Sequence, residues 1–283
     1  MTITAPSTPS GNSFGFVQSS GNDTFTLNGT SLTLPETLLD KVMVNAAGTG
    51  NSASLNTIGE TAAEAIHVGN DFSGGNKVQH LDAQGNAHDF LALSGFHSVF
   101  AYASPNDQGF IASTPGVKNV FVGAGSYAYM NSGNNAEDFY WISGAKYVYG
   151  YSSGPASPND FAYQYDGSGP STLVFAGGNY SYMTGTDQGR SFFNEAVGFK
   201  NTYGIAQHAG DTAFFYDSPL NDVFAGYSDH SYMYGVYPDG TLAYLDQAQA
   251  FEQVYAYSVN GGTDYAYNYD PNHVHTSGFI RLN

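Results

Sequence analysis

The chain has 283 residues, of which 24 are acidic and 7 basic, for a formal net charge of −17. With so few Lys and Arg, spread singly along the sequence, no cationic patch forms, which argues against nucleic acids, anionic membrane surfaces and anionic polysaccharides as partners. The absence of cysteine excludes disulfides, thiolate metal sites and cysteine nucleophiles, and the 16% aromatic content argues against a disordered chain.

The first 85 residues lack the pattern of the rest. The opening segment has neither a basic stretch nor an apolar run, so we expect no Sec-type signal peptide and no membrane insertion. The apolar stripe Leu38, Leu39 and Val42 predicts a short helix over Thr33–Met43, and a second is expected over Thr61–Ile66. We expect residues 1–85 to form an irregular N-terminal cap that covers the exposed end of a repeat stack.

The remaining residues, 86–283, contain an internal repeat. The sequence DFAYQYD at 160–166 returns as DTAFFYD at 211–217 and DYAYNYD at 264–270, with spacings of 51 and 53 residues. A weaker copy, DQGFIAS, occupies 107–113. Four units of about 52 residues are therefore predicted, and a period of this length is typical of solenoids and propellers.

Each unit holds about five short runs rich in Tyr, Phe and Val, alternating with period two and bounded by Gly, Asn, Asp, Ser and Pro. This pattern predicts an all-β fold with almost no helix between residues 86 and 270. We expect a right-handed parallel β-solenoid, or β-helix, of four units, with the hand taken from precedent. A β-propeller with one unit per blade is the alternative.

The repeat, with its D-x-A-x-x-Y-D core followed by SPLNDVF at 218–224, resembles the tandem repeats of large secreted bacterial proteins predicted to form β-solenoids. The sequence GNDTF at 21–25 is similar to a fragment common in calcium-binding RTX exoproteins, although the nine-residue repeat that defines their calcium sites is missing. The resemblance implies an extracellular or cell-surface location and export without a Sec-type signal peptide, and it implies no reaction.

Paired aspartates in the repeats are the first candidate site. Their side chains share one face of an extended strand, since the two members of each pair are six residues apart. Stacked repeats would align the carboxylates, either as calcium ligands or as caps of their own turns. The residues are Asp160 with Asp166, Asp211 with Asp217, and Asp264 with Asp270. Calcium is the one cofactor expected.

His273 and His275 form a second candidate site, because two histidines one residue apart point to the same side of a strand and can chelate a transition metal. The alternative is a polar C-terminal cap. No catalytic residue is predicted. Lys146, Lys200 and Glu252 share one repeat position, and a glutamate among lysines does not make a row of bases.

Tyrosines at alternate positions are the third candidate site and the one most relevant to function. They would stack on neutral sugars or on a neighbouring protomer if they face outward, or form a core ladder if they face inward. The rows are Tyr147, Tyr149 and Tyr151, and Tyr265, Tyr267 and Tyr269.

These observations favour a non-enzymatic, secreted structural or adhesive protein that self-assembles into an extracellular fibre or surface layer. Its partner would be a further copy of the chain, and a neutral polysaccharide is a second expected partner. Two alternatives remain open. One is a carbohydrate-active enzyme, a polysaccharide lyase or epimerase on a β-helix, and the other is a carbohydrate-binding module.

Overall fold

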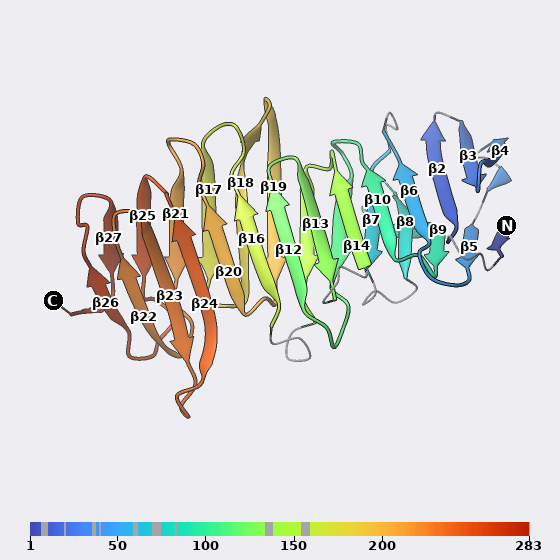
Figure 1. Ribbon diagram of the computed structural model, residues 1–283. Coiled ribbons are helices and arrows are strands. Elements are labelled where there is room, and N and C mark those ends of the chain that lie inside the picture. Colours follow the sequence, from blue (N-terminus) through green and yellow to red (C-terminus); the bar gives the residue numbers. More distant parts are fainter. Residues whose placement is uncertain are drawn as a thin grey trace. The chain divides into compact units, whose positions relative to one another are not determined.

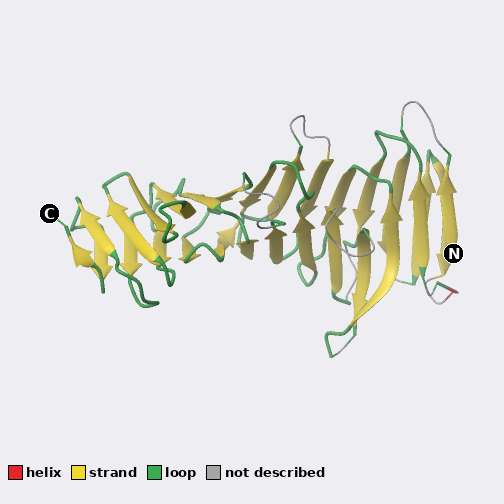
Figure 2. Ribbon diagram, turned by 90° about the horizontal axis from the view of Figure 1, so that it is seen from below, coloured by secondary structure: helices red, strands yellow, loops and turns green. Residues whose placement is uncertain are grey.

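The computed structural model describes residues 1–6, 11–19, 21–35, 38–39, 41–58, 62–69, 75–82, 84–133, 138–153 and 159–282. The described residues are almost entirely strand and loop (Figure 2). Their 28 strands form two large, mostly parallel sheets of 13 and 15 strands, which is consistent with a β-solenoid-like fold. The predicted all-β class is therefore confirmed.

By its internal contacts the chain divides into two compact units. The first comprises Met1–Val117 and Tyr127–Tyr149, and the second comprises Lys118–Ser126 and Gly150–Asn283. No described helix is long and apolar enough to cross a membrane.

The strands of the first unit are β1 (Thr2–Ala5), β2 (Ser13–Ser19), β3 (Asn22–Leu27), β4 (Thr30–Pro35), β5 (Val42–Ala46), β6 (Ser52–Asn56), β7 (Glu64–Gly69), β8 (Asn76–Leu81), β9 (Ala87–Ser94), β10 (Ser98–Tyr102), β11 (Gln108–Ala112), β13 (Tyr127–Ser132) and β14 (Asp138–Ser143). The last of the three divisions between the units along the chain falls within β15 (Tyr147–Tyr151).

The strands of the second unit are β12 (Asn119–Ala124), β16 (Phe161–Tyr165), β17 (Ser171–Ala176), β18 (Tyr180–Asp187), β19 (Arg190–Val197), β20 (Asn201–Ile205), β21 (Thr212–Tyr216), β22 (Asn221–Gly226), β23 (His230–Val236), β24 (Leu242–Gln249), β25 (Gln253–Tyr257), β26 (Tyr265–Asn268), β27 (Val274–Ser277) and β28 (Ile280–Arg281).

In the second unit the chain crosses between the two sheets after each single strand and after each three-stranded antiparallel meander (Figure 1). One repeat holds two single strands and one meander, so it contains three crossings. Because three is odd, successive meanders fall in opposite sheets: β17–β19 belongs to the 13-stranded sheet and β22–β24 to the 15-stranded sheet. Parallel pairing joins strands of successive repeats, as in β17 with β21 and β21 with β25.

The core of the second unit lies between its two sheets. In β21, Ala213 and Phe215 point inward while Thr212, Phe214 and Tyr216 point outward, as the period of two requires. Phe175 and Phe215 of one sheet and Phe224 of the other are fully buried in one cluster. Strands with this alternation are stabilised by burial of one face, at roughly 25 cal/mol per Å² of apolar surface.

The two predicted helices are wrong over most of the described residues, and Leu38 is the one residue of these segments that is described as helical. Thr33–Pro35 belongs to β4, Val42 and Met43 belong to β5, and Glu64–Ile66 belongs to β7. Val42 and Val44 are completely buried on one side of β5, so a period-two pattern outweighs the helical stripe through Leu38 and Val42. Residues 36, 37, 40 and 61 lie outside the described residues.

The region expected to be an irregular cap therefore contains strands β1 to β8. A division of the chain at residue 85 stays a prediction, as do the handedness and the number of repeats. The propeller alternative would require small, separate antiparallel sheets, whereas the described strands join into two large ones.

Candidate functional site

The carboxylates of this acidic chain are concentrated in its interior. Eleven described acidic residues are buried: Asp23, Glu64, Asp107, Asp138, Asp160, Asp166, Asp211, Asp217, Asp222, Asp246 and Asp264. A buried carboxylate requires hydrogen bonds, a proton or a cation. The local structure shows which of these each group receives.

The first aspartate of each repeat bonds to the backbone of the preceding repeat. Asp160 Oδ1 accepts the N–H of Asn119 at 2.8 Å, Asp211 Oδ1 that of Ser171 at 2.6 Å, and Asp264 Oδ1 that of Asp222 at 2.9 Å. The same bond recurs in the first unit. There Asp107 Oδ1 accepts the N–H of Glu64 at 2.9 Å, and Asn51 Oδ1 accepts the N–H of Asn12 at 2.7 Å. At Asp160, Asp211 and Asp264 this bond links neighbouring repeats, and we call it a clip. The expected capping of the residue's own turn is found at Asp270, whose Oδ1 accepts the N–H of Asn272 at 3.3 Å.

The second aspartate of each pair also accepts hydrogen bonds at a strand end. Asp166 accepts the backbone N–H groups of Gln207 and His208, both at 2.9 Å, and the Nδ1 of His208 lies 2.8 Å from its carboxylate. This contact raises the pKa of the His208 imidazole. Asp217 accepts the N–H groups of Val259 and Asn260 at 2.9 and 3.0 Å.

Asp166 and Asp211 form a carboxyl pair. Asp166 Oδ1 and Asp211 Oδ2 are buried and bond to no other described group. Burial, followed by the hydrogen bond to Asp166, raises the pKa of Asp211 to about 7. A proton on Asp211 near neutral pH reduces the repulsion between the two buried carboxyls.

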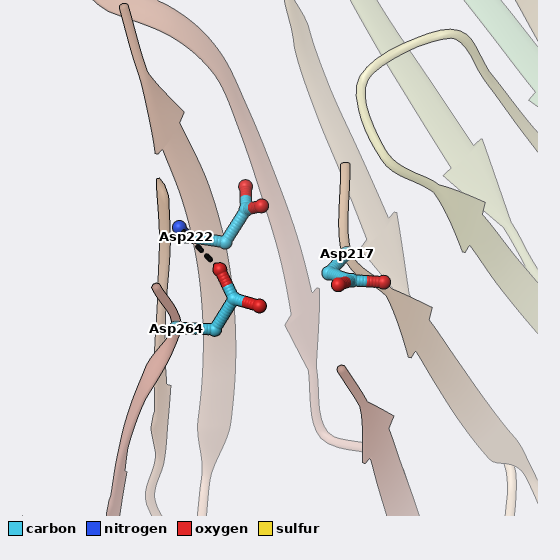
Figure 3. Close-up of side chains that lie close together, drawn as sticks. All are labelled: Asp217, Asp222 and Asp264. Atoms are coloured by element: carbon cyan, nitrogen blue, oxygen red, sulfur yellow. Dashed lines mark hydrogen bonds between the residues drawn. The ribbon is translucent and has the colours of Figure 1, made fainter. Parts of the chain in front are cut away.

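Asp217, Asp222 and Asp264 form the strongest candidate site (Figure 3). Asp217 follows β21, Asp222 lies in β22, and Asp264 precedes β26, which pairs in parallel with β22. All three are at least 95% buried, and one oxygen from each lies within 4.8 Å of those of the other two. Oxygen ligands at about 2.3–2.6 Å from a calcium ion lie at most about 4.6–5.2 Å from one another, so the spacing of the three aspartates suits one ion. The cluster could therefore hold a metal ion.

Hydrogen bonds fix the orientation of the cluster. Asp222 accepts bonds from Tyr244 Oη and from the N–H of Ser218 at 3.0 Å, and Asp264 Oδ2 accepts from Ser258 Oγ at 2.7 Å. Burial raises the pKa of Asp222 to about 6, although its hydrogen bonds act in the opposite direction. A cation bound at the cluster would offset the cost of burying the Asp222 carboxylate.

Asp222 was not among the residues predicted as ligands. It lies in the SPLND sequence that links β21 to β22. In the preceding repeat, where β16 is linked to β17, the corresponding residue is Ser171. Of the six predicted calcium ligands, Asp217 and Asp264 come together with Asp222. Asp160, Asp166, Asp211 and Asp270 lie at other strand ends, where calcium binding stays a prediction.

The histidine pair at the C-terminal end has separate partners. His273 Nδ1 lies 2.8 Å from Asp270 Oδ2, whereas His275 Nε2 lies 3.1 Å from Gln253 Oε1 and its ring stacks on Tyr255. Metal binding by His273 and His275 stays a prediction. Lys200 and Glu252 precede β20 and β25, which belong to opposite sheets, so the shared repeat position does not form a row there.

The predicted tyrosine rows lie on the outward side of their strands. Val148 and Gly150 of β15 and Ala266 of β26 are buried, and the tyrosines between them are half-buried or exposed, up to 59% for Tyr269. Tyr149 stacks on Phe110 at 5.3 Å, and Tyr267 lies parallel to Tyr269 at 6.3 Å. The interior is filled mainly by phenylalanine, valine, leucine and alanine.

The fold and the site define an all-β protein of two large, mostly parallel sheets with a buried aspartate cluster that could hold a metal ion. Comparisons of the chain with protein-family models, curated proteins and solved structures found no match.

Proposed function

We propose that this protein is a non-enzymatic structural or adhesive β-solenoid, located outside the cell, whose copies associate through the outward faces of their sheets. The observation that carries the proposal is the scarcity of charged residues in the central rows of both outward faces in the second unit, where Glu195 is the single carboxylate, in a chain of net charge −17. Extracellular location is supported by the resemblance of residues 86–270 to secreted tandem repeats.

On the 13-stranded sheet, strand register aligns two outward rows. One consists of Tyr180, Ala176, Tyr216, Tyr257 and Ser277, and the other of Glu195, Tyr182, Val174, Phe214, Tyr255 and His275. Glu195 is the one carboxylate in these rows, and burial raises its pKa. Parallel rings stack along the rows, as Phe214 does on Tyr255 at 5.2 Å and Tyr216 on Tyr257 at 5.4 Å.

On the 15-stranded sheet, register aligns Tyr163, Tyr203, Gln247, Tyr232, Ala225 and Tyr267 in an outward row without charge. Tyr163 and Tyr203 stack at 5.2 Å. Charge-poor surfaces rich in tyrosine are typical of the centres of protein interfaces. A second copy of the chain has the same strand spacing and the same tyrosine rings, so the outward face of one copy matches that of another in spacing and in chemistry.

Charge substitutions on the two faces test this proposal. Tyr203→Glu and Tyr257→Glu place a carboxylate in an outward row, and Tyr237→Glu places one in the β23–β24 loop, where Tyr237 is 50% exposed. Sedimentation velocity over a concentration series should show association of the parent chain. At least one of Tyr203→Glu and Tyr257→Glu, the face variants, should raise the dissociation constant for self-association about ten-fold. Tyr237→Glu, the loop variant, should change it by less than about two-fold. A parent chain that stays monomeric, or a loop variant as weak as both face variants, would contradict the proposal.

We further propose calcium as the ion of the cluster formed by Asp217, Asp222 and Asp264. Three carboxylates supply the hard oxygen ligands that calcium requires and relieve their mutual repulsion by binding it. Thermal unfolding at pH 8 tests this. Calcium should raise the melting temperature of the parent chain and of Asp239→Asn, which alters an exposed loop carboxylate. It should not raise that of Asp222→Asn. Stabilisation that persists in Asp222→Asn, or is absent from the parent, would contradict a calcium site here.

A further inference from the structure

A groove opens in the aromatic rows of the 13-stranded sheet within the second unit. Register places Ala176 of β17 directly between Tyr180 of β18 and Tyr216 of β21, and it places Val174 between Tyr182 and Phe214. Small side chains between aromatic ones leave a groove of about 490 Å³, which is within the usual range of small-molecule sites. Val174 and Ala176 form its floor, and the tyrosines of β18 and β21 line its sides.

The corresponding place on the 15-stranded sheet is occupied by the chain itself. There β22 places Val223 and Ala225 between tyrosines of β23 and β26 in the same manner. Tyr227, two residues after Ala225, stacks on Tyr269 at 4.7 Å and lies 6.3 Å from Tyr232. On the 13-stranded sheet Gly178 stands two residues after Ala176 and contributes no ring to the groove.

The spacing of the groove suits a single six-membered ring. Neighbouring strands are about 4.8 Å apart, so side chains of β18 and β21, with β17 between them, are separated by roughly 9.6 Å. A ring in van der Waals contact with both sides needs about 3.5–4 Å on each side, or about 7–8 Å in all, so one ring fits within this separation and two do not. Tyr180, which faces Tyr216 across the floor, is 44% exposed and accessible to a ligand.

The lining chemistry indicates an uncharged, hydroxylated ligand. Asn179, Ser218 and Asn260 line the groove, together with Asp217, whose carboxylate already accepts the N–H groups of Val259 and Asn260. No Lys or Arg is among the lining residues, so an anionic ligand finds no counter-charge. Apolar ring faces beside amides and hydroxyls match a pyranose, which has C–H faces and an equatorial rim of hydroxyls.

We propose that this groove binds a neutral saccharide, with one pyranose ring of an oligosaccharide inserted between Tyr180 and Tyr216. The site lies within one chain and does not depend on self-association. A uronate is disfavoured because its negative charge finds no counter-charge in the groove. An aromatic side chain is disfavoured because it cannot form hydrogen bonds with the polar residues at the edge of the groove.

Calorimetric titration with neutral hexasaccharides (cello-, xylo-, malto- and chito-oligosaccharides) and with hexagalacturonate tests the proposal, at a protein concentration where sedimentation shows monomer. At least one neutral sugar should bind and hexagalacturonate should not. Ala176→Phe, which supplies the missing ring, and Tyr216→Ala, which removes one wall, should each lower the affinity about ten-fold. Tyr163→Ala, which removes a stacked ring from the other sheet, should change it by less than about two-fold.

Several results would overturn the proposal. These are the absence of binding by every neutral sugar, equal binding of hexagalacturonate, and undiminished binding by both Ala176→Phe and Tyr216→Ala. Melting temperatures close to that of the parent chain identify variants that fold. If Ala176→Phe does not fold, Tyr216→Ala with its Tyr163→Ala control decides the matter.

Discussion

At the scale of single residues, the clip aspartates combine a structural and an electrostatic role. Asp211 accepts the buried N–H of Ser171, and burial together with the neighbouring Asp166 raises its pKa to about 7. Asn51, at the corresponding place in the first unit, makes the clip to Asn12 with a neutral amide. The hydrogen bond between neighbouring repeats therefore requires an acceptor oxygen on the side chain and does not require a negative charge.

Asp211→Asn and Asp211→Ala separate these two roles. The asparagine keeps the acceptor and removes the charge, so its free energy of unfolding at pH 8 should equal or exceed that of the parent chain. The alanine leaves the buried N–H of Ser171 without an acceptor and should cost about 1–3 kcal/mol. Urea unfolding at pH 8 measures both values. An alanine variant as stable as the parent would show that the clip contributes nothing.

The raised pKa values predict that stability falls as the pH rises. Asp211 and Asp222 have pKa values of about 7 and about 6, against roughly 4 in the unfolded chain, so between pH 4 and 7 the folded state binds more protons. His208, whose pKa Asp166 raises, acts in the same direction. Without calcium, the melting temperature should fall by about 5–10 °C from pH 5 to pH 8.

Thermal unfolding across this range, in the parent chain and in Asp211→Asn, measures the effect. The variant has lost one of the titrating groups, so its curve should be flatter. A melting temperature that rises between pH 5 and pH 8 would show that the buried carboxyls remain ionised in the folded state.

Sequence reasoning found most of these carboxylates but not their partners. The spacing of Asp211 and Asp217 predicted that they share one face of a strand, and both are buried, one on each side of β21. That Asp222 joins Asp217 and Asp264 depends on the parallel pairing of β22 with β26, about 40 residues apart. A single sequence does not contain that register, because it is set by how the repeats stack.

At the scale of strands, alternation was the most reliable signal. The DFAYQYD and DTAFFYD repeats correspond to β16 and β21, with their tyrosines outward. The odd number of crossings in each repeat was not predictable, because it depends on which turns reverse within a sheet and which cross to the other. The helix expected through Leu38 failed for a related reason, since burial of Val42 and Val44 in a sheet decided the conformation.

The inward positions of the strands predict where added volume is not tolerated. Gly204 of β20 faces Leu173 of β17 across the core, and a Cβ at this position would collide with the leucine side chain. Gly204→Ala should lower the free energy of unfolding by about 1–3 kcal/mol.

Thr172→Ala, on the outward side of β17, is the control and should change the free energy of unfolding by less than about 0.5 kcal/mol. Denaturant unfolding of both variants compares them. If Gly204→Ala were as stable as the control, the two strands would not pack as tightly as the structure shows.

At the scale of the whole chain, the placement of charge is the main result. A net charge of −17 by itself opposes association between copies. Eleven of the described acidic residues are buried, however, and burial raises the pKa of several, among them Asp107, Asp160 and Asp246. The central outward rows of the second unit are aromatic and nearly free of charge. Net charge alone therefore overstates the repulsion between two such faces.

The most direct test of this account is electron microscopy of the purified parent chain at rising concentration, at pH 7 with and without calcium. Association through uncharged tyrosine faces predicts ordered fibres or layers that increase with concentration and are lost in Tyr203→Glu or Tyr257→Glu. Dispersed single particles at every concentration, with and without calcium, would contradict the account.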